Sequence, residues 1–295
     1  MIMRSWTLGL CAIAYLNGAA GVRAESPPPA KCATIDAPRA IGGTFLRSVN
    51  NRGEVLGSYI DIRLTTNYFQ MSYGFYKTFD FPHAGFSTTS AAAWNNQGKI
   101  VGSYYDRKGG FHGFLLDRGL TIPMDYPGAA DTYALSINDK DQIAGVYTDS
   151  QGKRHLYLWK AGKYMSIDPK GVRDLHMLGV AINNLGHIAA TYRDSDGEHT
   201  YLSINGGRSM LRTSGAQTHF IVTGLNDRDD IVGNCLGEAP QSPAPCYLWR
   251  RGVFQRLTVS GSRGPVLAQS INNQRQIAGF YFDRGGMAHG FLMTP

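Results

Sequence analysis

Short apolar segments separated by turn residues run along the chain, and none has the 3.6-residue period of an amphipathic helix. The run YALSI (133–137) is followed by the turn NDKD and by the alternating segment QIAGVYT (142–148). After the turn DSQG come RHLYLW (154–159) and KYMSID (163–168). Four short strands joined by tight turns predict one small antiparallel sheet.

This unit recurs along the chain. An apolar residue followed by Asn-Asn or Asn-Asp occurs six times, 43 to 46 residues apart, with first members Asn50, Asn95, Asn138, Asn183, Asn226 and Asn272. Seven residues after each of these stands a glycine, except for Ala190 in the fourth copy. Four strands in about 40–45 residues are typical of a propeller blade. We therefore predict an all-β protein, a six-bladed β-propeller of four-stranded antiparallel blades.

The last copy stops before its fourth strand. In the second copy thirteen residues separate His112 from Asp125, whereas the same step from His289 passes the end of the chain. The segment KCATIDAPRAIGGT (31–44) matches such a fourth strand, with no earlier strands before it. We therefore predict that Ala33–Asp36 pairs with a strand around Gly290–Met293, which closes the ring and protects a sheet edge.

Residues 1–24 are typical of an export signal: a basic start at Arg4, a short apolar run, and VRA at 22–24. We expect residues 25–31 to be a linker and residues 32–295 to form the single propeller. The apolar run is too short to span a bilayer comfortably, and no later segment is apolar enough. These observations predict an exported protein, periplasmic or extracellular, with no membrane insertion after the signal is removed.

The charge balance is mildly basic, with 29 Lys and Arg against 22 Asp and Glu, a net charge of +7. Removing the predicted signal takes away Arg4 and Arg23 and leaves +5. The basic residues are scattered, whereas nucleic-acid binding needs a clustered stripe. We therefore expect no nucleic-acid partner, and we expect a monomer.

The pattern INNxGxIVGxYxDxxGxxHGF resembles the HAF repeat of exported bacterial proteins. HGF occurs at 112–114 and 289–291, and related triplets are YGF (73–75), HLY (155–157), HTY (199–201) and PCY (245–247). The resemblance covers residues 32–295. It implies exported propeller-like repeats, and it brings no catalytic residues with it.

Histidines recur at the start of the third strand, as His112, His155, His199 and His289. Equivalent positions on different blades lie too far apart to share a metal. We predict that each histidine hydrogen-bonds within its own blade, to a turn Asp or to the Tyr of the second strand.

The connections between successive blades vary most among the copies, and sites in propellers usually gather there. Seven residues before the repeat Asn, three neighbouring connections carry Asp131, His176 and His219. We predict a ligand-binding surface from these residues with Arg173 and Arg263. Two histidines and a carboxylate are also a metal-binding set, which we keep as a weaker hypothesis. We expect no cofactor.

The predicted mature chain contains Cys32, Cys235 and Cys246. Cys235 and Cys246 occupy the second and third strands of the fifth copy, where they face each other to within one residue of register. The sequence predicts a disulfide between them and leaves Cys32 as a buried thiol.

The sequence shows the architecture more clearly than the activity. There is no G-x-S-x-G elbow, phosphate-binding loop or H-E-x-x-H motif. Our first hypothesis is an exported, non-catalytic propeller that binds a protein or glycan on the face of the blade-to-blade connections. The alternative is a secreted carbohydrate-active hydrolase or lyase, because paired carboxylates would meet only in three dimensions.

Overall fold

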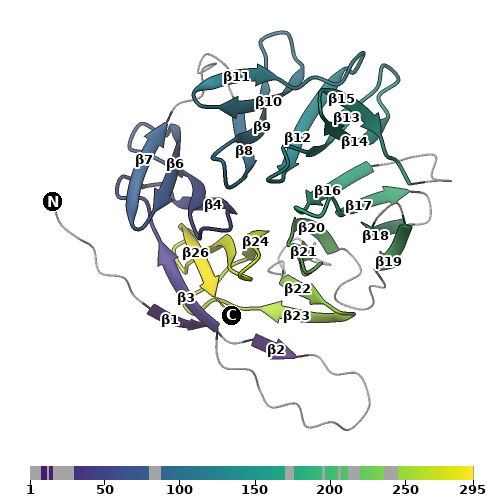
Figure 1. Ribbon diagram of the computed structural model, residues 1–295. Helices are drawn as coiled ribbons and strands as arrows, with labels where there is room; N and C mark the ends of the chain where they lie inside the picture. The colour runs from purple at the N-terminus through teal and green to yellow at the C-terminus, as the bar shows by residue number, and fades with distance from the viewer. Residues whose placement is uncertain are drawn as a thin grey trace, which may run out of the picture.

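The computed structural model describes residues 8–11, 13–15, 30–79, 88–169, 176–194, 197–204, 207–211, 220–235 and 245–294. Its strands form six antiparallel sheets arranged as a ring around a central axis (Figure 1). Each sheet holds four strands of one blade, with the first strand innermost and the fourth outermost. The predicted six-bladed β-propeller is confirmed.

The first three blades contain four consecutive strands each. Blade one consists of β4 (Thr44–Val49), β5 (Val55–Ile60), β6 (Thr66–Ser72) and β7 (Phe75–Phe79). Blade two consists of β8 (Thr88–Trp94), β9 (Ile100–Tyr105), β10 (Phe111–Asp117) and β11 (Leu120–Pro123). Blade three consists of β12 (Asp131–Ile137), β13 (Ile143–Thr148), β14 (Arg154–Lys160) and β15 (Lys163–Ser166). The predicted ends of the four strands of blade three are correct to within two residues.

The last three blades complete the ring. Blade four consists of β16 (His176–Ile182), β17 (Ile188–Asp194), β18 (Gly197–Ile204) and β19 (Gly207–Leu211). Blade five consists of β20 (Phe220–Leu225), β21 (Ile231–Cys235), β22 (Cys246–Arg250) and β23 (Val253–Leu257). Blade six consists of β24 (Val266–Ile271), β25 (Ile277–Phe282) and β26 (Ala288–Thr294), with the N-terminal strand β3 (Ala30–Ile35) as its fourth.

The two ends of the propeller are joined in blade six. Strand β3 lies antiparallel beside β26 (Figure 1), with Ile35 opposite Gly290 and Cys32 opposite Met293. The predicted pairing is confirmed. The free edge that β26 would otherwise present is therefore covered by the start of the repeat region.

Two short strands lie within the predicted signal. Strand β1 (Leu8–Cys11) pairs with the outer edge of β3, and β2 (Ile13–Tyr15) pairs with the outer edge of β23. They extend the sheets of blades six and five to five strands in the full chain. Among the described residues, no helix combines the length and the apolar character needed to cross a membrane.

The repeat Asn residues bind neighbouring blades to one another. All six are buried, and their side-chain oxygens accept backbone N–H groups of their own turns, as Asn138 Oδ1 does from Lys140 N at 3.0 Å. Five of the amides also donate to the backbone oxygen of the equivalent Asn in the next blade. The donors are Asn95, Asn138, Asn183, Asn226 and Asn272. The repeated Asn is therefore a structural residue.

The second residue of each Asn pair forms a closed ring of hydrogen bonds. Its backbone N–H donates to the side-chain oxygen of the equivalent residue in the next blade, at 2.7 to 2.9 Å. The six members, in ring order, are Asn51, Asn96, Asp139, Asn184, Asp227 and Asn273. Only a residue with a short side-chain acceptor makes this bond, which explains why the second position is always Asn or Asp.

The repeated glycine lies beside a bulge in the first strand. A Cβ added at Gly145 would lie 2.1 Å from the backbone oxygen of Tyr133 and 2.7 Å from the ring of Tyr157. In five blades the bulge residue, which has no partner on the second strand, is the third residue before the repeat Asn. In blade four, where Ala190 replaces the glycine, the bulge lies two residues earlier, at position 178. The glycine and the bulge position therefore change together.

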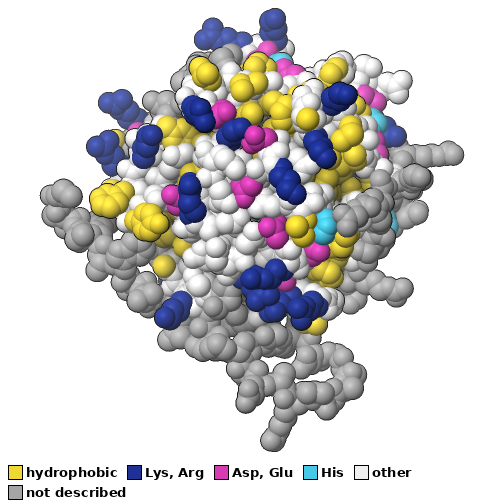
Figure 2. Space-filling model, viewed as in Figure 1, with side chains coloured by type: hydrophobic (Ala, Val, Ile, Leu, Met, Phe, Trp, Pro, Cys, Tyr) yellow, Lys and Arg dark blue, Asp and Glu magenta, His cyan; other side chains and the backbone are white. Residues whose placement is uncertain are grey.

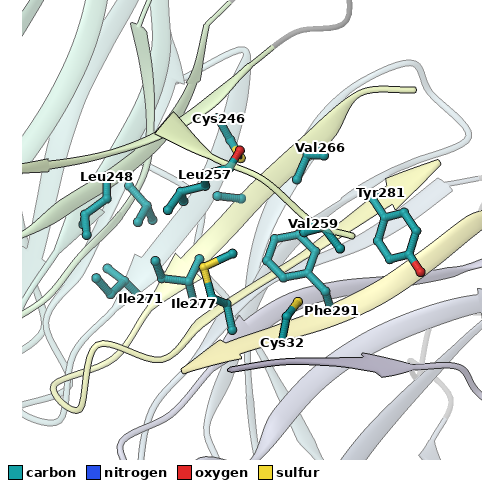
Figure 3. Packing of buried hydrophobic residues seen from close by; sticks show 13 residues of the cluster. Cys32, Cys246, Leu248, Leu257, Val259, Val266, Ile271, Ile277, Tyr281 and Phe291 are labelled. Atoms are coloured by element: carbon teal, nitrogen blue, oxygen red, sulfur yellow. The ribbon is translucent and has the colours of Figure 1, made fainter. Parts of the chain in front are cut away.

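The hydrophobic cores lie between neighbouring blades. Figure 3 shows the core between blades five and six, where Leu248 and Leu257 lie opposite Ile271 and Ile277. Cys32, from the N-terminal strand, packs in the same cluster near Phe291. The N-terminal strand therefore supplies part of the core as well as an edge.

The predicted disulfide does not form. All three described cysteines are free, and each is buried. Cys246 pairs in register with Asn234, so that Cys235 is displaced by one residue. Because side chains alternate between the two faces of a sheet, the thiols point in opposite directions. Cys246 belongs to the core with blade six and Cys235 to the core with blade four. Burial raises the pKa of Cys246 to about 12.

Candidate functional site

Three histidines of the third strand, His112, His155 and His289, each lie between two carboxylates of their own blade. His155 Nδ1 is 2.7 Å from Asp168 Oδ2, and its Nε2 is 3.1 Å from Asp149 Oδ2. His112 has the same contacts with Asp125 and Asp106. The rings also stack on the second-strand tyrosines, as Tyr147 does with His155 at a centroid distance of 4.9 Å. The predicted hydrogen bonding within each blade is confirmed for these histidines.

The carboxylates raise the pKa of two of these imidazoles, those of His112 and His289. Burial alone would lower the pKa of His112, but the hydrogen bonds and charges of Asp125 and Asp106 raise it above its ordinary value. The same balance, with Asp36 and Asp283, raises the pKa of His289. The histidines therefore act within their blades and are not held ready for a ligand.

The residues predicted for the junction-face site are not brought together where the structure describes them. Asp131 begins the innermost strand of blade three, and its Oδ1 accepts the backbone N–H of Phe111 at 2.9 Å. Arg263 is exposed and precedes β24 in blade six, across the ring from blade three. Arg173 and His219 lie outside the described residues, as does the side chain of His176. The described residues contain no group of three His, Cys, Asp or Glu able to hold a metal.

The propeller axis contains a small cavity at the end that carries the Asn turns, which we call the Asn end. The cavity measures about 90 Å³ and is lined by both Asn rings and by bulge residues of the first strands. Arg47 is one of these, and its guanidinium carbon lies 5.8 Å from the ring centroid of Phe45 and 5.9 Å from that of Phe280. Burial lowers the pKa of Arg47. The second residues of the Asn pairs in this lining bind one another in a closed ring.

A larger cleft of about 610 Å³ opens between blades one and two, also at the Asn end. Blade two provides an apolar wall: Trp94, Ile100 and Leu116 occupy one cross-strand row on the sheet face that looks toward blade one. Blade one provides a mainly polar wall. Its members are Arg52, Glu54, Gln70, Ser72, Lys77 and Phe79. The turn that contains Arg118 and Gly119 borders the cleft on the side of blade two.

The cleft exists because this junction lacks a contact that its equivalents have. Elsewhere the residue four after the repeat Asn reaches the residue three after the Asn of the next blade. Lys99 Nζ lies 2.7 Å from Asp141 Oδ2, and His187 Nδ1 lies 2.8 Å from Asp229 Oδ1. Between blades one and two the equivalent residues are Glu54 and Gly98, and a Cβ at Gly98 would find nothing within 4 Å. Glycine also occupies this position at Gly53 and Gly186, but there Gln276 and Gln142 come within 3.1 and 3.4 Å of an added Cβ. The space between blades one and two therefore remains because Glu54 does not reach across to Gly98.

Glu54 is turned away from the junction by partners in its own blade. Its carboxylate accepts hydrogen bonds from Asn50 Nδ2 at 2.7 Å, Ser72 Oγ at 2.8 Å and Arg52 Nε at 2.9 Å. Asn50 consequently directs its amide to Glu54, whereas the other five repeat Asn amides donate to the next blade. Burial alone would raise the pKa of Glu54, but these hydrogen bonds and the charge of Arg52 lower it. The carboxylate is therefore ionised and fixed.

The wall of blade two contains polar atoms without partners. Only three buried side-chain polar atoms in the described part of the chain lack a hydrogen bond, and Trp94 Nε1 is one of them. Thr121 Oγ1 is another, and Thr121 stands opposite Leu116 in the same cross-strand row. A buried polar group in a native protein normally has a partner. Both atoms are buried; Trp94 itself lines the cleft, whereas Thr121 lies behind the lining residue Leu116.

The sequence contained a signal for this cleft that titratable clusters do not reveal. Four residues after the repeat Asn, the copies facing a glycine in the next blade carry Gln142 and Gln276, whereas blade one carries Glu54. Trp94 is also the one aromatic residue directly before a repeat Asn; the other five positions carry Val, Ile or Leu. Comparing the copies position by position across each junction identifies the site.

The cleft lies at the end opposite the predicted binding face. The blade-to-blade connections, which carry Asp131 and Arg263, enter the first strands at one end of the ring, and the Asn turns leave them at the other.

The face seen in Figure 2 mixes Lys and Arg with acidic and hydrophobic side chains. On that face the basic residues form no continuous stripe of the kind that nucleic-acid binding uses.

Comparison with known proteins supports the fold alone. No family model matches the chain, and no curated protein matches it. A gluconolactonase from Xanthomonas campestris is similar in structure, with a TM-score of 0.61, 11% identity and 99% of both chains covered. A putative TolB from Agrobacterium tumefaciens has a TM-score of 0.57 and 10% identity, covering 88% of this chain and 92% of its own.

A lectin from Aleuria aurantia, solved in complex with Fucα1-6GlcNAc, has a TM-score of 0.52 and 10% identity. The match covers 86% of this chain and 94% of the lectin. Enzymes and binding proteins thus share this architecture, and both kinds of role are compatible with it. Because a fold does not determine a function, the residues of the site must distinguish an enzyme from a binding protein.

Proposed function

We propose that this chain is an exported, non-catalytic propeller that binds a glycan in the cleft between blades one and two. The observation that supports this most directly is the cleft's composition, with an apolar wall around Trp94 facing a polar wall around Glu54. Sugars have apolar C–H faces and polar rims, and an aromatic side chain with an N–H donor suits both. The cleft volume also lies within the range of about 300–1,000 Å³ typical of ligand sites.

The acid–base chemistry of the cleft favours binding over hydrolysis. Glycoside hydrolysis uses two carboxyl groups, one of them a general acid with a raised pKa. Glu54 is the one carboxylate among the residues that line the cleft. The pKa of Glu54 is lowered, and its oxygens are occupied by Asn50, Ser72 and Arg52. This residue is therefore suited to orienting Arg52 and not to proton transfer.

Four further parts of the proposal rest on the sequence. We propose that residues 1–24 direct export, that the repeats belong to the HAF type, that the chain is a monomer, and that no nucleic acid is a partner. The set Asp131, Arg173, His176, His219 and Arg263 stays a prediction for a second surface at the opposite end. A protein partner remains the alternative to a glycan at the cleft.

Binding of the purified chain to an array of neutral and acidic oligosaccharides tests the proposal. We expect binding that weakens about three- to tenfold in Trp94→Phe, because that change reduces the apolar surface of the wall and keeps an aromatic ring. Trp159→Phe, which alters an indole of blade three outside the cleft, is the matched control and should bind like the unchanged chain.

Three outcomes would contradict the proposal. Equal binding by Trp94→Phe and the unchanged chain would place the glycan elsewhere. Cleavage of an array ligand, detected as shortened products by mass spectrometry, would favour the alternative hydrolase or lyase. Empty arrays together with capture of a protein ligand would exclude a glycan partner.

A further inference from the structure

We propose that the glycan in this cleft is acidic, with carboxylates that reach cations on both walls. This inference rests on the proposed glycan-binding function and names its ligand class. The inference follows from the positions of the charged residues around the cleft.

The lining has more positive than negative charge. It contains Arg52, Lys77 and Arg118 but only one carboxylate, Glu54. Arg52 Nη2 lies 2.7 Å from Glu54 Oε2, so these two charges neutralise each other. Lys77 is exposed, and it takes part in none of the ion pairs found among the described residues. Arg118 is 94% exposed, and its Nε is 4.0 Å from Asp117 Oδ1, the limit of an ion pair. Lys77 and Arg118 are therefore the cations left for a ligand.

These two cations stand on opposite walls. Lys77 lies on β7 directly opposite Gln70, on the sheet face of blade one that lines the cleft. Arg118 lies in the turn between β10 and β11 of blade two, where its positive φ of 49° and that of Gly119 form a tight hairpin. A ligand in the cleft passes between Lys77 and Arg118. Two carboxylates on one oligosaccharide would form ion pairs with both of these cations.

The apolar wall distinguishes a saccharide from other polyanions. Trp94, Ile100 and Leu116 provide a surface for the C–H face of a sugar ring, and Gln70 and Ser72 provide polar groups on the other side. A compact inorganic anion would use the two cations alone and leave the apolar wall uncovered. A uronic-acid oligosaccharide matches both the charges and the apolar wall.

The test compares tetragalacturonate with its fully methyl-esterified form, which has the same sugars without the charges. Titration calorimetry on the full chain at about 50 mM salt limits screening. We expect the acid form to bind about five- to tenfold more tightly, since each exposed charge contact contributes modestly. Lys77→Gln and Arg118→Gln should each weaken the acid form about two- to fivefold and leave the ester unchanged. Lys163→Gln, on the outer strand of blade three, is the matched control.

The outcomes separate the two proposals. If the ester binds as tightly as the acid and Trp94→Phe weakens both, the glycan-binding function stands and the acidic specificity is wrong. If neither form binds and the array shows no other ligand, both proposals fall. If tripolyphosphate displaces tetragalacturonate with equal affinity and Trp94→Phe has no effect, the cleft recognises charge alone, which contradicts the saccharide assignment.

Discussion

His289 and Asp36 are 253 residues apart in the sequence, yet His289 Nδ1 lies 2.9 Å from Asp36 Oδ2. In blade three the equivalent pair, His155 and Asp168, is only thirteen residues apart, at 2.7 Å. The closure of the ring therefore reproduces, from the two ends of the propeller, a contact that is local in the other blades. The side chains and the strand pairing of β3 with β26 support the same closure.

Deleting residues 25–37 should destabilise the whole propeller, although the segment has the appearance of a dispensable tail. The deletion removes β3, exposes the edge of β26 and takes Cys32 out of the core with Phe291. We expect a clear fall in the melting temperature, measured by circular dichroism. Deletion of residues 25–29 alone, which keeps β3, is the control; equal melting of both variants would show that closure contributes little.

The contribution of His289 to stability should depend on pH. Its pKa is raised above the ordinary value of 6.5, so its stabilising effect is full below that value and is lost as the pH rises through the raised pKa. The pKa of Asp283 is lowered from 3.8, so its effect is lost only as the pH falls through the lowered value.

Urea unfolding of the unchanged chain and of His289→Gln tests this dependence. We expect a larger difference in the free energy of unfolding near about pH 5.5 than near about pH 8.5. A difference that stays constant across this range would contradict a charged imidazole in the folded protein.

Gly279→Ala should destabilise the propeller by about 1–3 kcal/mol, because a Cβ there forces nearby atoms to move. The added Cβ would lie 2.1 Å from the backbone oxygen of Leu267 and 2.8 Å from the ring of Phe291. Urea unfolding measures the loss. Ala190→Gly, at the equivalent position of blade four, should cost about 0.5–1 kcal/mol, since only backbone flexibility is added. An equal or larger loss from Ala190→Gly would contradict the link between glycine and bulge.

Cys32, Cys235 and Cys246 should all be free thiols that react only after unfolding. Each is at most 3% exposed. In the native protein we expect no alkylation of these three residues, and in denaturant without a reducing agent we expect all three to be alkylated. Peptide mass spectrometry reads the modification residue by residue. A peptide pair linked through Cys235 and Cys246 would show that the register between β21 and β22 differs from the one described here.

The repeated residues allowed the fold to be predicted because they are tied to backbone geometry. The Asn pairs, the glycines beside the bulges and the His-Asp contacts occur at fixed offsets, and each offset corresponds to one position in a blade. Six copies of such a pattern specify six equivalent sheets. The absent fourth strand of the last copy predicted that Ala33–Asp36 pairs with a strand around Gly290–Met293, since an open sheet edge is unfavourable.

The pairing of the cysteines and the position of the site could not be predicted correctly from the sequence. The disulfide prediction was wrong by one residue of register, which is enough to send Cys235 and Cys246 to opposite faces of the sheet. The cleft depends on residues of two blades, Glu54 and Gly98, whose relation appears only when neighbouring copies are placed side by side. The residue type at one position, such as Asp131 or Arg263, does not show which residues of other blades lie near it in the folded ring.

The sequence by itself determined the number of blades, the strand order and the closure. These follow from local offsets that every copy repeats. The tertiary structure alone decided which thiols approach each other, which junction opens into a cleft and which polar atoms in it lack partners. The physical reason is that these properties arise from differences between adjacent copies, and such differences act only across the packed interface where two blades meet.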